Sequence, residues 1–167
     1  MIDIYFTTVA GDNMSKWFYI NFIVIIIVIW KFSTSSINII HILGIIGFAL
    51  FMFNWMRHAM FSTIRSKIPR KKKIIYAKFS KRAMPIHRWT GTIALVIIIF
   101  HAHAVIKFYG FQPDNYKMTF GLMALIMMIF TVILGWLRQL RTTVGRRILH
   151  LSFAFTLFYI VIIHIIL

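Results

Sequence analysis

The sequence predicts an all-α protein, an integral membrane helical bundle of about five transmembrane helices. Hydrophobic residues occupy 60% of the 167 positions and charged residues only 13%, whereas a soluble domain has about 25% charged residues. Five apolar runs recur along the chain, and about 20 apolar residues span a bilayer as a helix. Since five strands cannot close a barrel of this apolarity, each run is predicted to be a helix.

The first apolar run covers residues 17–32 and is the shortest of the five. A signal peptide cleaved at the small residues 33–35 is therefore an alternative. Trp30 followed by Lys31 instead favours an anchor at the membrane interface. The residues upstream match no predicted element, which leaves Met14 as an alternative start of the chain.

The other four runs each have the length of a membrane span and cover residues 37–56, 87–109, 118–137 and 148–167. All five tryptophans lie at ends of the runs, as expected for an interfacial aromatic belt: Trp17, Trp30, Trp55, Trp89 and Trp136. Between the second and third runs, residues 57–86 are predicted to form a basic loop. The whole chain, residues 1–167, is predicted to be a single transmembrane domain.

The distribution of basic residues predicts how the chain crosses the membrane. Residues 57–88 contain eleven of the nineteen Lys and Arg residues, and residues 138–147 contain four more. Cytoplasmic loops carry an excess of such residues. The amino terminus is therefore predicted to be cytoplasmic and the carboxyl terminus outside, in a multi-pass protein of the plasma membrane.

The basic segment 57–88 also predicts a partner. Next to a membrane span, a basic run such as residues 69–73 indicates binding to anionic lipid rather than to nucleic acid. Docking of an acidic soluble protein is the alternative.

Acidic residues and cysteine contribute little to this sequence. The three acids, Asp3, Asp12 and Asp114, lie outside the apolar runs, which argues against a carboxylate relay for protons or cations. The chain has no cysteine, which excludes disulfides, thiolate metal sites, iron–sulfur clusters and covalently attached haem. Any chemistry must come from histidine, methionine, aromatic residues or a bound cofactor.

Four histidines form two pairs with the same spacing. His87 and His101 lie fourteen residues apart in the third run, and His150 and His164 lie fourteen apart in the fifth. Fourteen helical residues rise about 21 Å and end about 40° from the starting face. Because the third and fifth spans cross in the same direction, His87 is predicted to lie level with His150, and His101 level with His164.

Imidazoles that face each other at two depths indicate two bis-histidine haem sites, since neutral imidazole is an axial ligand of haem iron. Small residues follow two of the histidines by four positions: Gly91 follows His87, and Ala154 follows His150. Such residues leave room for a flat macrocycle, although they also serve close helix packing. Interhelical hydrogen bonding is the alternative role for any single histidine in a span.

Other residues near these histidines are candidate contacts. Arg88 and Arg147 are candidates to pair with haem carboxylates, because guanidinium binds carboxylate through two hydrogen bonds. Alternatively, they are solvent-exposed charges that only help to set the orientation of the chain in the membrane. His41 and His58 are candidate propionate contacts or plain interfacial residues. His103 follows the third-run ligand candidate by two positions, hence about 200° around the helix, and is expected to face elsewhere.

The chain resembles the ferric reductase-like transmembrane domain in residues 85–91, which read Pro-Ile-His-Arg-Trp-Thr-Gly, and in the following His101. Residues 146–150 and His164 look like the second ligand-bearing helix of that domain. The superfamily includes NADPH oxidases, ferric reductases and the haem-binding partner of bacterial methionine sulfoxide reductase. The resemblance covers residues 37–167.

The resemblance implies two stacked b-type haems that pass electrons across the membrane. His87 and His150 are then expected to hold the inner haem, and His101 and His164 the outer haem. The sequence has no nucleotide-binding fingerprint, so flavin or NAD(P)H is expected only on a separate donor protein, unless quinol supplies the electrons.

The expected function is therefore that of a di-haem b electron-transfer protein. It would be an oxidoreductase subunit that reduces an extracytoplasmic acceptor. Two alternatives remain at this point: a histidine-lined carrier for a transition metal, and a structural or assembly subunit whose histidines only bond between helices.

Overall fold

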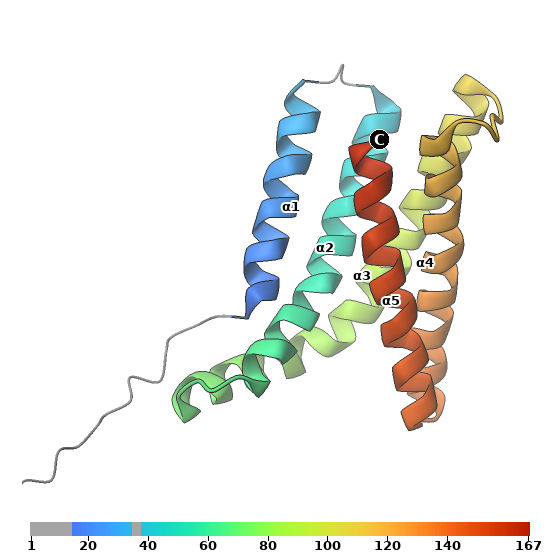
Figure 1. Ribbon diagram of the computed structural model, residues 1–167. Coiled ribbons are helices and arrows are strands. Elements are labelled where there is room, and N and C mark those ends of the chain that lie inside the picture. The colour runs from blue at the N-terminus through green and yellow to red at the C-terminus, as the bar shows by residue number, and fades with distance from the viewer. Residues whose placement is uncertain (1–14, 35–37) are drawn as a thin grey trace, which may run out of the picture.

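The computed structural model describes residues 15–34 and 38–167, which form five helices and no strand. The helices are α1 (Lys16–Ser33), α2 (Ile39–Arg65), α3 (Arg70–Tyr109), α4 (Tyr116–Leu140) and α5 (Val144–Ile166) (Figure 1). All five are long and apolar enough to cross a membrane. The predicted all-α bundle of about five spans is thus confirmed. Asp3, Asp12, Met14 and residue 35 lie outside the described residues.

Polar side chains cap the start of four of these helices. Ser15, Asn38, Asn115 and Thr143 each accept a hydrogen bond from a backbone N–H in the first turn. Such caps satisfy a donor that the helix itself leaves unpaired. At the other end of α3, Gly110 has a φ of 76° and a ψ of 169°, a backbone conformation that is essentially confined to glycine.

The basic segment expected as a loop at residues 57–86 is almost entirely helical. α2 continues to Arg65 and α3 begins at Arg70, which leaves residues 66–69 as the link. The difference has a physical reason: hydropathy marks where a helix leaves the apolar layer, not where its backbone stops being helical. Lys and Arg are good helix formers, so both helices extend beyond the predicted spans.

Helices α2 to α5 surround a common interior. α2 packs along α3, α4 packs along α5, and α3 also contacts α4. Between α2 and α5, the rings of Trp55 and Phe158 stack with centroids 4.4 Å apart. α1 lies outside this group and packs on α2 (Figure 1). Its Lys31 Nζ donates a hydrogen bond to the Ile165 carbonyl oxygen of α5 at 2.8 Å.

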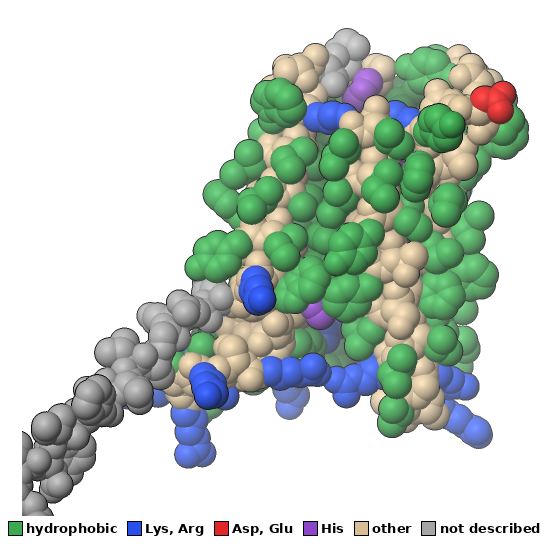
Figure 2. All heavy atoms as spheres, in the orientation of Figure 1, with side chains coloured by type: hydrophobic (Ala, Val, Ile, Leu, Met, Phe, Trp, Pro, Cys, Tyr) green, Lys and Arg blue, Asp and Glu red, His purple; other side chains and the backbone are tan. Residues whose placement is uncertain are grey.

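The surface divides into an apolar band and two polar ends. Figure 2 shows hydrophobic side chains over the middle of the molecule and most of the visible Lys and Arg at the end where α5 begins. Asp114, the acidic residue of the described chain, lies in the connection between α3 and α4. This arrangement is typical of a protein whose sides contact lipid. The chain is a multi-pass membrane protein.

Candidate functional site

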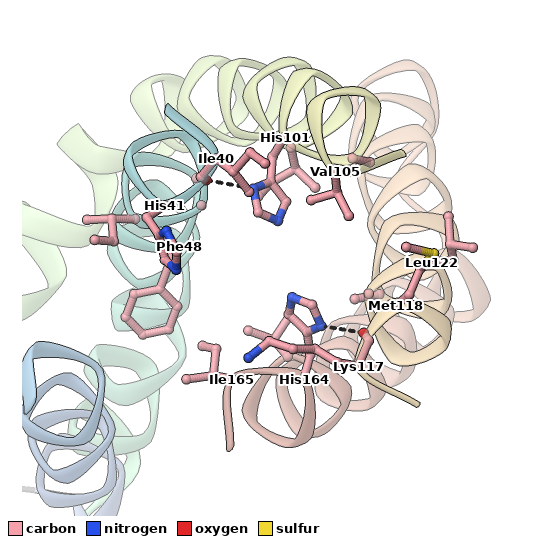
Figure 3. A pocket seen from close by; sticks show the side chains of 18 of the residues that line it. Ile40, His41, Phe48, His101, Val105, Lys117, Met118, Leu122, His164 and Ile165 are labelled. Atoms are coloured by element: carbon pink, nitrogen blue, oxygen red, sulfur yellow. Dashed lines mark hydrogen bonds between the residues drawn. The ribbon is translucent and has the colours of Figure 1, made fainter. Parts of the chain in front are cut away.

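The four paired histidines face the interior of the bundle from α3 and α5. The rings of His87 and His150 have centroids 6.5 Å apart and an interplanar angle of 83°; the rings of His101 and His164 have the same separation and angle. Figure 3 shows His101 and His164 pointing toward one another. We name His87 with His150 the inner pair, and His101 with His164 the outer pair, after the predicted orientation.

The separation within each pair is that of two imidazoles on opposite sides of one metal ion. A coordinated imidazole nitrogen lies about 2.0–2.1 Å from the metal and about 1.2 Å from its own ring centre, which places opposed rings about 6.4 Å apart. A direct hydrogen bond between the rings, with nitrogens about 2.9 Å apart, would bring their centres to about 5.3 Å. The observed 6.5 Å therefore favours a shared ion over a direct bond.

Backbone carbonyl groups orient three of the four imidazoles. In each case Nδ1 lies within hydrogen-bond distance of a carbonyl oxygen on a neighbouring helix: His101 with Ile40 at 3.0 Å, His150 with Thr131 at 3.0 Å, and His164 with Lys117 at 2.8 Å. A carbonyl oxygen only accepts, so Nδ1 carries the hydrogen and Nε2 keeps its lone pair. Histidines that bind metals are usually held in this way.

A glycine lies against each of these three imidazoles. A Cβ atom added to the glycine would approach the Cε1 atom of the ring: 3.2 Å from Gly44 to His101, 2.9 Å from Gly121 to His164, and 3.5 Å from Gly135 to His150. Each glycine follows by four positions the residue whose carbonyl accepts the bond, so it lies one helical turn away on the same face. We call a carbonyl and its glycine a histidine seat.

The histidine seats repeat with the same period as the histidines. On α4, Gly121 and Gly135 are fourteen residues apart. Fourteen positions after the seat on α2 come Asn54 and His58, so the fourth seat lacks its glycine. In agreement, the Nδ1 atom of His87 is buried and has no hydrogen-bond partner among the described residues. The period shared by the glycines and the histidines is the sequence signal that would have identified the seats.

A cavity adjoins each histidine pair, and the two cavities differ in size. The cavity at the outer pair has a volume of about 490 Å³, within the range of about 300–1,000 Å³ common for cofactor sites. The cavity at the inner pair has about 100 Å³. The outer cavity therefore has the volume of a cofactor site. A porphyrin at the inner site would require lining side chains such as Arg88 to move aside.

Cationic side chains surround the inner pair. Arg88 lines the inner cavity, with its guanidinium carbon 5.8 Å from the Trp136 ring centroid. Arg147 is exposed and does not line the cavity. Arg57 and Arg138, which the sequence did not single out, interact electrostatically with both inner histidines. The Nε atoms of both arginines are buried without a hydrogen-bond partner among the described residues.

Cations and a third histidine also line the outer cavity. Lys31 and Lys117 both border it, and Figure 3 shows the Lys117 side chain extending past His164 into the open space. His41 borders the same cavity and donates from Nδ1 to the Asn38 side-chain oxygen at 2.8 Å. The outer cavity thus offers positive charge and polar donors beside its histidine pair.

The remaining two histidines, His58 and His103, line neither cavity. His58 is packed among three aromatic rings, with centroids 4.7–5.2 Å from its own. His103 is exposed, as expected from its position about 200° around the helix from the ligand candidate on α3.

The donor set fits haem better than a bare metal ion. Residues 15–34 and 38–167 contain no group of three or more His, Asp or Glu placed to hold a metal ion. A bare transition metal bound by protein commonly takes three or four protein ligands. Haem iron receives four nitrogens from the porphyrin and needs only two from the protein, so each histidine pair satisfies it.

The fold and the site together define a class: a multi-pass helical membrane protein with two histidine pairs between the same two helices. Comparison of the chain with protein-family models, curated proteins and solved structures gives no match.

Proposed function

We propose that this chain is a di-haem b electron-transfer protein that carries electrons across a membrane. The observation that carries the proposal is the 6.5 Å ring separation in both pairs, which suits one iron between two imidazoles. The resemblance to the ferric reductase-like transmembrane domain supports the same function. The donor is a cytoplasmic-side protein or quinol, and the acceptor is extracytoplasmic.

Each histidine pair has a defined task in this proposal. His87 and His150 hold the inner haem, and His101 and His164 hold the outer haem. Bound haem supplies reversible one-electron chemistry at its iron. The protein keeps Nε2 free for the metal through the bonds at Nδ1 and makes those ligands more basic. The apolar helices exclude water and provide the low dielectric that tunes the potentials.

The partition between the two cavities also suits electron transfer. Phe51, Met128 and Leu157 line both cavities, so a single layer of side chains separates them. Leu157 and Met128 belong to the buried cluster at the centre of the bundle. Haems bound at the two sites would therefore be held close together without a water-filled path between them.

A redox difference spectrum tests the proposal directly. Protein purified from cells that make haem is expected to show reduced b-type bands and to contain about two haems per chain in a pyridine haem assay. Protein without haem under those conditions contradicts the proposal. The two alternatives predict otherwise: a metal carrier would give metal flux into vesicles without a haem spectrum, and a structural subunit would give neither.

Two arginines near the inner pair, whose Nε atoms are buried, give a second prediction. We propose that Arg57 and Arg138 pair with the carboxylates of the inner haem, since their Nε atoms have no partner in the described chain and Arg suits carboxylates. Replacing both with Gln removes positive charge beside the iron. The midpoint potential of one haem is expected to fall by an amount on the order of tens of millivolts, as measured by redox titration.

The control for this variant is Arg141→Gln, which alters an exposed arginine at the end of α4. We expect it to leave both potentials unchanged. Equal potentials in the double variant and the unmodified protein would refute the role of Arg57 and Arg138, but would leave the haem proposal intact.

A further inference from the structure

An exposed apolar stripe runs along almost the whole length of α3. Its members are four or seven residues apart and lie within about 60° of one another around the helix. They are Ile75, Phe79, Ile86, Ile93 and Phe100, which are 65, 58, 49, 47 and 59% exposed. The last two belong to the apolar run 87–109, whose outer face contacts lipid in a membrane-spanning helix. The stripe therefore reaches from the span into the basic half of α3, where Arg82 lies on the same face between Phe79 and Ile86.

The first half of α3, residues 70–86, is basic beside this stripe. Lys71, Lys78 and Arg82 are exposed and lie next to Ile75 and Phe79 around the helix. A helix with an apolar face flanked by Lys and Arg is typical of one that lies in the membrane interface.

The face of residues 70–86 that attaches this segment to the bundle lies beside the apolar stripe. Ser80 and Ala83 are buried, and they lie on the side of the helix away from Lys78 and Arg82. The basic residues and the apolar stripe are consequently left outside, available to a partner.

The length of α3 also places its first half at the membrane surface. Its 40 residues correspond to about 60 Å of helix, whereas a bilayer with its headgroups is about 40–45 Å thick. Pro85 lies inside the helix, and proline removes a backbone hydrogen bond and favours a bend. Figure 1 shows the first part of α3 running obliquely at the end of the bundle where α1 begins.

We propose that residues 70–86 form an interfacial helix that inserts Ile75 and Phe79 into one leaflet. Lys71, Lys78 and Arg82 bind the headgroups of anionic lipids there. Continuity with the lipid-facing stripe of the span favours lipid as the occupant over an acidic soluble protein, and the basic flanks select anionic headgroups. The inference does not depend on the proposed haem function.

Site-directed spin labelling tests the depth of this helix in the full-length protein. The chain has no cysteine, so one introduced cysteine carries a single label. Phe79→Cys places the label on the stripe, and Lys81→Cys, about 200° around the helix, is the matched control. In vesicles of phosphatidylcholine and phosphatidylglycerol, we expect oxygen to relax the label at 79 more than a water-soluble nickel chelate does. The label at 81 should show the reverse.

The part played by charge is tested in the same vesicles. Replacing Lys78 and Arg82 with Gln in the protein labelled at 79 should reduce its shielding from nickel to the level seen in phosphatidylcholine alone. Unchanged shielding would overturn the headgroup contact. Equal nickel accessibility at 79 and 81 would overturn the insertion. Shielding at 79 that arises only after a cytosolic extract is added would also overturn it, because the helix would then be covered by a protein. Ile75→Cys gives an independent second reading of the stripe.

Discussion

Replacing His101 with Ala is expected to remove one haem of two and to leave the other in place. The same result is expected for His164→Ala, since under the proposed function each of these two histidines supplies one of the two protein ligands of the outer iron. The inner pair lies fourteen residues, or about 21 Å of helix, away on each helix. The pyridine haem assay should fall from about two haems per chain to about one, and redox titration should lose one component.

The control for these variants is His103→Ala. His103 is exposed and lies two residues from His101, so this change alters the same helical turn without touching the cavity. Both haems should remain. His87→Ala should remove the component that His101→Ala spares. Two haems in both His101→Ala and His164→Ala would show that these residues are not the ligands.

The fold followed from composition because lipid imposes a simple rule on a spanning segment. Backbone groups must bond within the segment and side chains must be apolar, so each span is visible as a run of apolar residues. The rule does not determine how far a helix continues outside the membrane. That is why the extension of α2 to Arg65 and the start of α3 at Arg70 could not be predicted from the apolar runs.

The histidine pairing also followed from the sequence, because it depends only on helix geometry. A spacing of fourteen returns a side chain to nearly the same face, and two parallel helices with this spacing form two levels. Which residues lie opposite these histidines depends on the rotation of α2 and α4 about their own axes. Arg57 and Arg138 lie on those helices, so their proximity to the site emerged only from the structure.

The incomplete fourth seat makes the two pairs chemically different. Both outer imidazoles donate from Nδ1 to a carbonyl, whereas only one inner imidazole does. A hydrogen bond at Nδ1 makes the imidazole a stronger donor to the metal. The seats are therefore expected to control ligand strength as well as ligand position, and glycine is the residue that makes the close approach possible.

Gly121→Ala is accordingly expected to damage the outer haem site. The new Cβ atom would lie 2.9 Å from Cε1 and 3.1 Å from Nδ1 of His164, so the imidazole has to move and its bond to the Lys117 carbonyl is strained. We expect partial loss of one haem, or a shift in its potential, when the assay and titration used for the histidine variants are repeated. Alanine is a better helix former than glycine by about 1 kcal/mol, so a loss cannot be attributed to a weakened helix.

Gly135→Ala is the matched control, because it makes the same chemical change at the equivalent seat one period further along α4. There the added Cβ atom would lie 3.5 Å from Cε1 of His150, an ordinary van der Waals distance, and both haems should be retained with unchanged potentials. Equal damage in both variants would point to a general effect on α4 packing. No damage in either would mean that the imidazole of His164 has room to adjust, and that the glycine seat does not restrain it.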